Sequence, residues 1–255
     1  MSVTPSSFLS TAIEAAQAAA DVILHYYEKN VEVQIKKDQT PVTVADVESE
    51  QVIREIIATQ FPDHGIFGEE AGRTESTSDY LWLIDPIDGT KSFISSNPFF
   101  STQIALMQGT DIILGVSNAP AFGELACAEK GQGAWLNDQP CRVSDITELE
   151  NCAISTGNLR TLASGDRWGK LGEIISRVNR IRGYGDFYQY HLLATARIDA
   201  VIESDVDILD IAAASLIVSE AGGTFTDLEG AGVDLETCSV LAANSELHDV
   251  LLAAL

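Results

Sequence analysis

Two carboxylates, Asp85 and Asp88, follow the apolar stretch 81–84. This stretch has the length and composition of a buried strand, and Pro86 and Gly89 are expected to end it. Asp85 is then expected at the strand end and Asp88 in the bend that follows, so that both face one cation. Mg²⁺ prefers such hard oxygen ligands. The alternative is an ordinary strand and turn, in which the Asp-Gly pair is only turn chemistry.

A phosphate site is predicted directly after these acids. Thr90 stands where a helix could begin, and the first amides of a helix have no intrahelical partner. The amides of Gly89, Thr90 and Lys91 would therefore point outward to receive a phosphate oxygen. We assign phosphate binding to Asp88, Gly89 and Thr90.

Three further acidic segments supply candidate ligands. Glu69 follows an expected apolar turn at 65–67. Asp210 precedes the apolar helical stretch 211–218, and its alternative role is that of the helix N-cap. Asp46 lies three residues after Thr43, so that its alternative role is an acidic first turn in a capped helix.

These segments resemble the inositol monophosphatase superfamily of magnesium-dependent, lithium-sensitive phosphomonoesterases. The family's Asp-Pro-[Ile/Leu]-Asp-Gly-Thr signature is unaltered at 85–90, and its Gly-Glu-Glu stands at 68–70. The family's Trp-Asp-x-Ala-Ala is present at 209–213, with Leu209 in place of the usual Trp, and Val-Thr-x-Ala-Asp is present at 42–46. The resemblance covers nearly the whole chain.

The resemblance implies a set of metal ligands. Glu69, Asp85 and the carbonyl of Ile87 would hold one Mg²⁺, while Asp85, Asp88 and Asp210 would hold a second, with Asp85 as the bridge. Two such ions, or three, generate a hydroxide and stabilise the departing alkoxide. No covalent enzyme intermediate is then required.

The resemblance also implies the catalytic group. Thr90 and Asp46 would form a hydrogen-bonded pair that orients and deprotonates the attacking water, and Glu69 belongs to the catalytic group as well as to the ligands. A non-catalytic scaffold on this fold would be expected to have lost ligands, and here every one is present.

Helical and strand patterns alternate along the chain in the order that this family requires. The resemblance implies an α/β fold, with an α+β N-terminal half and an α/β C-terminal half, arranged as the layered αβαβα sandwich of the inositol monophosphatase and fructose-1,6-bisphosphatase type. We expect closely packed halves at 1–147 and 148–255. Helices are predicted at 8–27, 44–60, 211–218 and 246–255, and strands at 103–106, 112–116, 125–128, 201–203 and 240–242.

Composition limits the partners. The formal net charge of −23 argues against nucleic acid and anionic membranes, and it would repel a phosphate substrate unless metal ions reversed the local field. The four cysteines form no Cys-x-x-Cys pair, so that reduced thiols are expected. No basic region precedes an apolar stretch, and no run approaches the length of a membrane span. We expect a cytoplasmic homodimer that acts on a small phosphate monoester.

Substrate choice depends on the segment 185–199, which resembles histidinol-phosphate phosphatases, enzymes of histidine biosynthesis. Asp186 stands where inositol phosphatases carry a small hydroxyl residue, and Glu203 is shared by both branches. Both carboxylates would bind the amine or imidazole, and Tyr188 would stack on the ring. A helix face packed on the sheet is the alternative role of the tyrosine.

Other substrates remain open. A bisphosphate nucleotidase of the same superfamily often has Lys after Asp-Gly-Thr, as at Lys91 here. An inositol-1-monophosphatase or a fructose-1,6-bisphosphatase is the next alternative.

Overall fold

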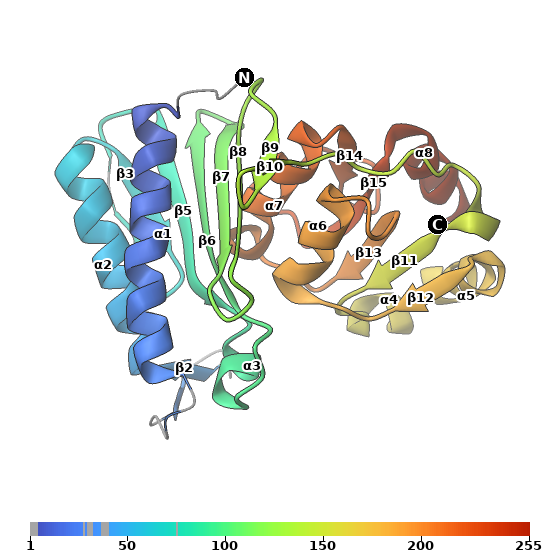
Figure 1. Cartoon of the computed structure of the whole chain (residues 1–255). Coiled ribbons are helices and arrows are strands. Elements are labelled where there is room, and N and C mark those ends of the chain that lie inside the picture. Colours follow the sequence, from blue (N-terminus) through green and yellow to red (C-terminus); the bar gives the residue numbers. More distant parts are fainter. Residues whose placement is uncertain (1–4, 28, 30–32, 37–40, 75) are drawn as a thin grey trace.

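Helical and sheet layers alternate across the molecule, as Figure 1 shows from left to right. The computed structural model describes residues 5–27, 29, 33–36, 41–74 and 76–255. Two helices cover one face of an eight-stranded sheet, two more lie between this sheet and a five-stranded sheet, and further helices cover the outer face of the second sheet. The predicted αβαβα sandwich is confirmed.

The first layer consists of α1 (Ser7–Tyr26) and α2 (Val44–Gln60). Alanines at every third or fourth position give α1 a smooth buried face, so that its backbone lies close to the sheet. Thr43 caps α2 by accepting a hydrogen bond from the Ala45 amide at 3.1 Å, and Asp46 completes a capping box. The predicted helix 44–60 and its cap are confirmed.

The first sheet has the strand order β10-β9-β8-β7-β6-β5-β3-β4. All its neighbours pair antiparallel except β3 and β5, which are parallel. Its strands are β3 (Gly65–Gly68), β4 (Gly72–Arg73), β5 (Tyr80–Asp88), β6 (Ser101–Gln108), β7 (Asp111–Ala119), β8 (Glu124–Glu129), β9 (Ala134–Leu136) and β10 (Gln139–Pro140). A separate antiparallel pair joins β1 (Val33–Ile35) to β2 (Pro41–Thr43).

Two predictions about this sheet were wrong. The strand at 81–84 does not end before Pro86 but continues as β5 to Asp88, with a register shift against β6 between Asp85 and Asp88. Proline has no amide to donate, so the ladder accommodates it by this irregularity. The residues 65–67, expected to form a turn, lie in strand β3, where they pair with β5.

The middle layer consists of α6 (Asp186–Ala194) and α7 (Ile208–Glu220). Helix α7 is apolar on all sides because it is covered by both sheets. It lies so close to β7 that a side chain at Gly115 would overlap the backbone of Ala213. The place of Asp210 at the start of α7 is therefore fixed by direct packing on the first sheet.

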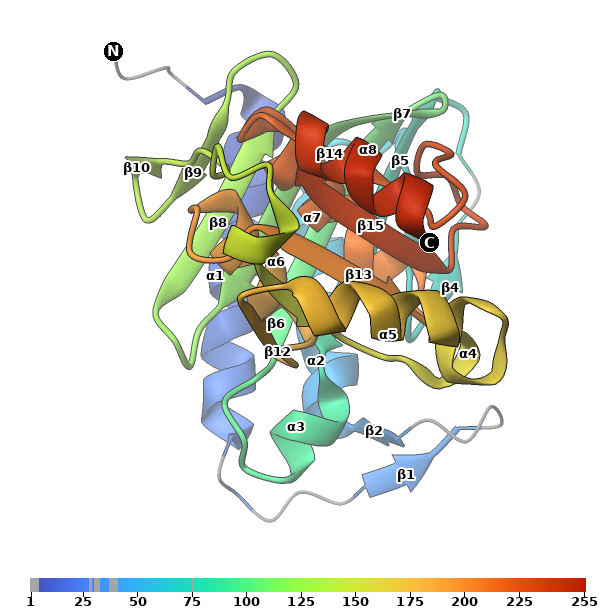
Figure 2. The ribbon, with the colours of Figure 1, turned by 90° about the vertical axis from the view of Figure 1, so that its right-hand side faces the viewer.

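The second sheet has the order β12-β11-β13-β15-β14 and is parallel only at its first two pairings. Figure 2 views it from outside, with α5 and α8 in front of β13 and β15. The remaining elements are α3 (Thr90–Ile94), a 3-10 turn (Leu149–Asn151), β11 (Ala153–Thr156), α4 (Arg160–Ser164), α5 (Arg167–Arg177), β12 (Arg180–Arg182), β13 (Ala200–Ser204), β14 (Gly223–Thr226), β15 (Ser239–Asn244) and α8 (Ser245–Ala254).

Helix α1 corrects one further expectation. By length and composition alone it is able to cross a membrane, although the sequence analysis found no run of that length. Ala12, Ala16 and Ile23 of this helix are fully buried in the cluster that α1 and α2 form with the first sheet, while Leu24 is exposed. This is the arrangement of an apolar helix in a protein core.

Candidate active site

The two signature carboxylates lie at the end of β5, on either side of its irregular stretch. Asp85 and Asp88 are 2% and 8% exposed. The amide of Ile87 donates to Asp85 Oδ1 at 2.9 Å, and the amide of Phe187 donates to Asp88 Oδ2 at 3.2 Å. The irregular strand thus turns both acids toward the start of the middle helices.

Asp210 joins them from the first turn of α7. The N-cap of this helix is Asp207, which accepts from the Leu209 amide at 2.9 Å, so the alternative of an N-cap at Asp210 was wrong by three residues. Asp210 instead occupies the third helical position and accepts from the Asp207 amide at 3.1 Å. Carboxylate oxygens of Asp85, Asp88 and Asp210 all lie within 4.8 Å of one another.

Clustered acids are costly without a cation. Burial raises the pKa of Asp210 to about 7. Burial, and then the charges of Glu69 and Asp210, raise the pKa of Asp85 well above its usual range. Burial, and then the charge of Asp186, do the same for Asp88. A bound cation would remove this penalty because carboxylates must be ionised to coordinate it. The donor set therefore fits a hard metal ion.

Glu69 lies beside this trio in the turn after β3, where it is paired with a lysine. Lys36 Nζ lies 2.8 Å from Glu69 Oε1 and 2.7 Å from Glu70 Oε1. Burial tends to lower the pKa of Lys36, but its hydrogen bonds to the two glutamates raise the pKa above the usual value. Lys36 directly follows β1 and is the last residue of the described stretch 33–36, and residues 37–40 lie outside the described residues. This pairing was not predicted.

The turn from β5 into α3 provides the predicted helix start. Gly89 is the N-cap of α3 and has a φ of 88°, in the left-handed region. A Cβ at this position would also overlap the carbonyl oxygen of Phe99. Only glycine fits, and it leaves the first amides of α3 beside Asp88, where they could receive an anion.

Thr90 and Asp46 come together across 44 residues of sequence. Thr90 Oγ1 donates to Asp46 Oδ1 at 3.2 Å and to the Ile87 carbonyl at 3.0 Å. Asp46 Oδ2 accepts from the amide and the hydroxyl of Thr43, both at 2.7 Å. Burial raises the pKa of Asp46, although the Thr43 and Thr90 hydrogen bonds oppose this. Asp46 therefore completes the capping box with Thr43 and also accepts a hydrogen bond from Thr90.

The three predicted substrate residues have different surroundings. Asp186 is the first residue of α6, and its pKa is raised by burial against the opposing charge of Lys91. The ring of Tyr188 lies 4.8 Å from that of Phe122 and 5.5 Å from that of Phe99, centroid to centroid. Asp186 and Tyr188 are partly exposed.

Glu203, in contrast, is 3% exposed and lies inside a hydrogen-bonded network. Its Oε2 accepts from Gln189 Nε2 and, at 2.7 Å, from the Tyr190 hydroxyl, while its Oε1 accepts from the Asn158 amide at 3.0 Å. Burial raises its pKa to about 7. The geometry gives Glu203 three internal partners.

A buried polar chain behind the acids was missed by the sequence reasoning. Ser101 Oγ donates to Asp88 Oδ2 at 3.3 Å and accepts from Gln103 Nε2 at 2.8 Å. Gln103 Nε2 also donates to Ser117 Oγ at 3.0 Å, and Ser117 Oγ lies 2.9 Å from His191 Nε2. The signal was available, since Ser-Thr-Gln opens an otherwise apolar strand beside the signature.

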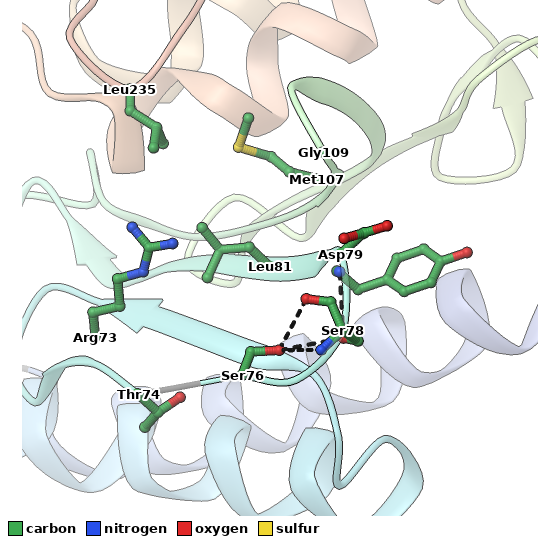
Figure 3. A pocket seen from close by; sticks show the side chains of 10 residues that line it. Arg73, Thr74, Ser76, Ser78, Asp79, Leu81, Met107, Gly109 and Leu235 are labelled. Carbon is green, nitrogen blue, oxygen red and sulfur yellow. Dashed lines mark hydrogen bonds between the residues drawn. The ribbon is translucent and has the colours of Figure 1, made fainter.

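The opposite end of β5 holds a cavity of about 600 Å³, shown in Figure 3. Arg73 and Asp79 line it together with Ser76 and Ser78, which are hydrogen bonded to each other. Asp79 is the one acid among its described lining residues, whereas three carboxylates come together at the other end of the strand. The candidate chemistry is therefore assigned to the Asp85 end.

Comparison with known proteins shows the family of this chain. Residues 4–255 match the sequence model of the inositol monophosphatase family. The chain belongs to the inositol monophosphatase family. It is 36% identical to the histidinol-phosphatase of Chlorobaculum parvum over 97% of this chain and 96% of that protein. It is 32% identical to the inositol-1-monophosphatase of Rhizobium meliloti over 96% and 95%.

The fold agrees with solved structures of this family. The extragenic suppressor protein suhB from Bartonella henselae superimposes with a TM-score of 0.91 at 32% identity, over 98% of each chain. The family consists of phosphatases that use metal ions, and among the residues that the structure describes the trio of Asp85, Asp88 and Asp210 could bind one.

Proposed function

We propose that this member of the inositol monophosphatase family is a Mg²⁺-dependent phosphomonoesterase that hydrolyses histidinol phosphate. The metal assignment is supported by the trio of buried Asp85, buried Asp88 and partly buried Asp210, with Glu69 beside it. Bound Mg²⁺ would lower the pKa of a water molecule and stabilise the charge on the departing oxygen. The carbonyl of Ile87 would complete the ligands, in a site of two ions or three.

The chain's own residues have two tasks in this reaction. Thr90 and Asp46 would orient the attacking water and take its proton, because Asp46 Oδ1 holds the threonine hydroxyl while Oδ2 is occupied by Thr43. The amides of Gly89 and Thr90 at the start of α3 would hold the phosphate next to Asp88.

The proposed substrate rests on the position of Asp186. Asp186 directly precedes Phe187, whose amide donates to Asp88 Oδ2 at 3.2 Å, so Asp186 lies close to the metal-binding trio. The partly exposed ring of Tyr188 stands two residues further along α6. A carboxylate and an aromatic ring at the edge of a phosphate site suit a substrate with an amine and an imidazole. The similarity to a histidinol-phosphatase supports this choice.

The test is the variant Asp186→Asn, which keeps the size of the side chain and removes its charge. A charge-assisted hydrogen bond contributes about 1.5–3 kcal/mol, so kcat/KM for histidinol phosphate should fall by roughly ten- to a hundredfold. Hydrolysis of inositol 1-phosphate should change little, because its alcohol carries no positive charge. Asp166→Asn, at the exposed start of α5, is the matched control.

Equal losses on both substrates would show that Asp186 supports the scaffold rather than the substrate. Two other substrates have specific support. The similarity to an inositol-1-monophosphatase favours inositol phosphate, and Lys91 after the signature favours a nucleotide bisphosphate. A phosphate-release panel of all three decides among them, and brisk cleavage of phosphoadenosine phosphate without cleavage of histidinol phosphate would contradict our proposal.

A further inference from the structure

The turn that carries Glu69 is short and has backbone groups that need partners. It connects β3 to β4 through Glu69, Glu70 and Ala71. The amide of Glu69 donates to the Ile84 carbonyl at 3.1 Å, which ties the start of the turn to β5. The next two amides have no strand to pair with, and a backbone donor left without a partner in a partly buried turn is costly.

Glu50 of α2 supplies both of these partners. The amide of Glu70 donates to Glu50 Oε2 at 2.7 Å, and the amide of Ala71 donates to Glu50 Oε1 at 3.0 Å. Glu50 is 1% exposed. A carboxylate this deeply buried is retained only when it is fully hydrogen bonded and paired. Here its two oxygens are divided between two consecutive amides of one turn.

Arg54 balances the charge of Glu50 from one helical turn further along α2. Its Nε donates to Glu50 Oε1 at 2.6 Å, and its Nη2 donates to the carbonyl of Gly72, where β4 begins. Glu50 thus binds the amides within the turn, and Arg54 binds the Gly72 carbonyl that follows it.

Gly68 shows how closely the turn fits against Glu50. A Cβ at Gly68 would overlap the Glu50 carboxylate, and the glycine has no left-handed φ that would by itself require glycine. Contact with the Glu50 carboxylate therefore explains why position 68 is a glycine.

We propose that Glu50 is a positioning residue that fixes the turn so that Glu69 is preorganised for the metal. This inference rests on the proposed metal site. Glu50 follows Asp46 by four residues, so both lie on one face of α2. Asp46 holds Thr90 and Glu50 holds the Glu69 turn. One rigid helix thereby aligns the water-orienting group with a metal ligand that lies on a different strand connection.

The variant Glu50→Gln tests this proposal. In glutamine an NH2 group replaces one of the two carboxylate oxygens, so one of the Glu70 and Ala71 amides would face a donor and lose its acceptor. Two quantities are measured: the hydrogen exchange of these two amides in the metal-free protein, and the dissociation constant for Mg²⁺ by calorimetry. Faster exchange is expected, together with Mg²⁺ affinity weakened by about 10- to 100-fold, as for other groups that orient metal ligands.

Two features of the experiment separate positioning from general damage. At saturating Mg²⁺, kcat of Glu50→Gln should recover to near the wild-type value, because the metal then holds Glu69 in place. The matched control is Glu55→Gln, which makes the same change on an exposed part of α2 and should leave both quantities unchanged. If Glu50→Gln does not fold, Gly68→Ala decides the matter, because its methyl group displaces the carboxylate of Glu50 without changing any charge.

An unchanged Mg²⁺ affinity in the variant, or unchanged exchange at Glu70 and Ala71, overturns the role of Glu50. Failure of the proposed function gives a different result. In that case wild-type protein itself binds no Mg²⁺ and releases no phosphate, whatever residue occupies position 50.

Discussion

Single residues in this site have two roles at once. The sequence left Asp46 either as part of a helix start or as a catalytic group. One of its oxygens completes the capping box with Thr43 and the other accepts from the Thr90 hydroxyl, so the helix start leaves the proposed catalytic role open. Thr90 itself is not a cap, since Gly89 holds that position and the threonine hydroxyl donates to Ile87 and Asp46. Local structural patterns and catalytic motifs therefore overlap instead of excluding each other.

The Thr90 and Asp46 pair is tested by a double-mutant cycle. Thr90→Ala and Asp46→Asn should each lower kcat by about 10²- to 10⁴-fold, the usual contribution of a positioned acid-base group. Mg²⁺ affinity should change little, and Thr90→Ser should retain most of the activity. The double variant should be no slower than the worse single one, because the two groups act as a unit. Additive losses in steady-state kinetics would show that they serve separate steps.

Asp85→Asn tests the proposed bridging ligand. The variant should bind Mg²⁺ far more weakly in calorimetry and lose activity by orders of magnitude. In the absence of metal, however, its melting temperature should rise, because burial and the charges of Glu69 and Asp210 make the ionised carboxylate unfavourable. Asp63→Asn, an exposed acid before β3, should alter neither property. Wild-type Mg²⁺ affinity in Asp85→Asn would remove Asp85 from the site.

At the scale of elements, the periodicity located α1, α2, α7 and α8 well, but it did not locate α5 and placed the strand ends poorly. Helix α2 has the predicted bounds because Thr43 and Asp46 mark its start. Strand β5 continues through Pro86 because β6 pairs with β5 on both sides of an irregularity. Such tertiary pairing is not visible in a local sequence pattern. The short strand β3 was expected as a turn because four residues hold too little alternation to be recognised.

The close contact between α7 and β7 leads to an element-scale prediction. In Gly115→Val the new side chain would overlap the backbone of Ala213 and push α7 outward. Overpacking of this kind costs about 1–3 kcal/mol of unfolding free energy. Mg²⁺ affinity should fall as well, since α7 carries Asp210. As a control, Gly169→Ala fills open space on α5 and should stabilise the protein by about 1 kcal/mol.

Denaturant unfolding and calorimetry measure the two effects of Gly115→Val. A destabilised variant with unchanged Mg²⁺ affinity would mean that α7 does not need this packing to place Asp210.

At the scale of the whole molecule, the family resemblance, and not pattern analysis, predicted that distant segments lie close together. Periodicity alone gave no reason for residues 46, 69, 85 and 210 to converge, because convergence depends on the layer order. The two partners that lie outside the motifs, Lys36 and Glu50, were missed for the same reason. The net charge of −23 predicted that a phosphate substrate would be repelled unless metal ions reversed the local field. The raised pKa values of Asp85, Asp88 and Asp210 come from burial and from neighbouring acids.

These raised pKa values predict the pH dependence of the metal-free protein. Burial raises the pKa of Asp210 from 3.8 to about 7 in the folded state. Below the pKa of Asp210 in the unfolded chain, the folded and the unfolded protein both carry the proton, and the contribution of the protonated Asp210 to stability is fully present. Between about pH 4 and 7 the unfolded chain releases the proton first, so stability is lost as pH rises through this range.

The wild-type free energy of unfolding should therefore fall more steeply with pH than that of Asp210→Asn in denaturant titrations without metal. Saturating Mg²⁺ should remove the difference in slope, because the ion binds the ionised form. Parallel pH profiles of the two metal-free proteins would show that Asp210 titrates normally.

The most direct test is phosphate release from histidinol phosphate by metal-stripped protein as Mg²⁺ is added. We predict no release before Mg²⁺ is present, a saturable rise during the titration, a faster rate than with inositol 1-phosphate at the same Mg²⁺ concentration, and complete loss when a chelator is added. Full release in metal-free buffer, or no release at any Mg²⁺ concentration, would contradict the account.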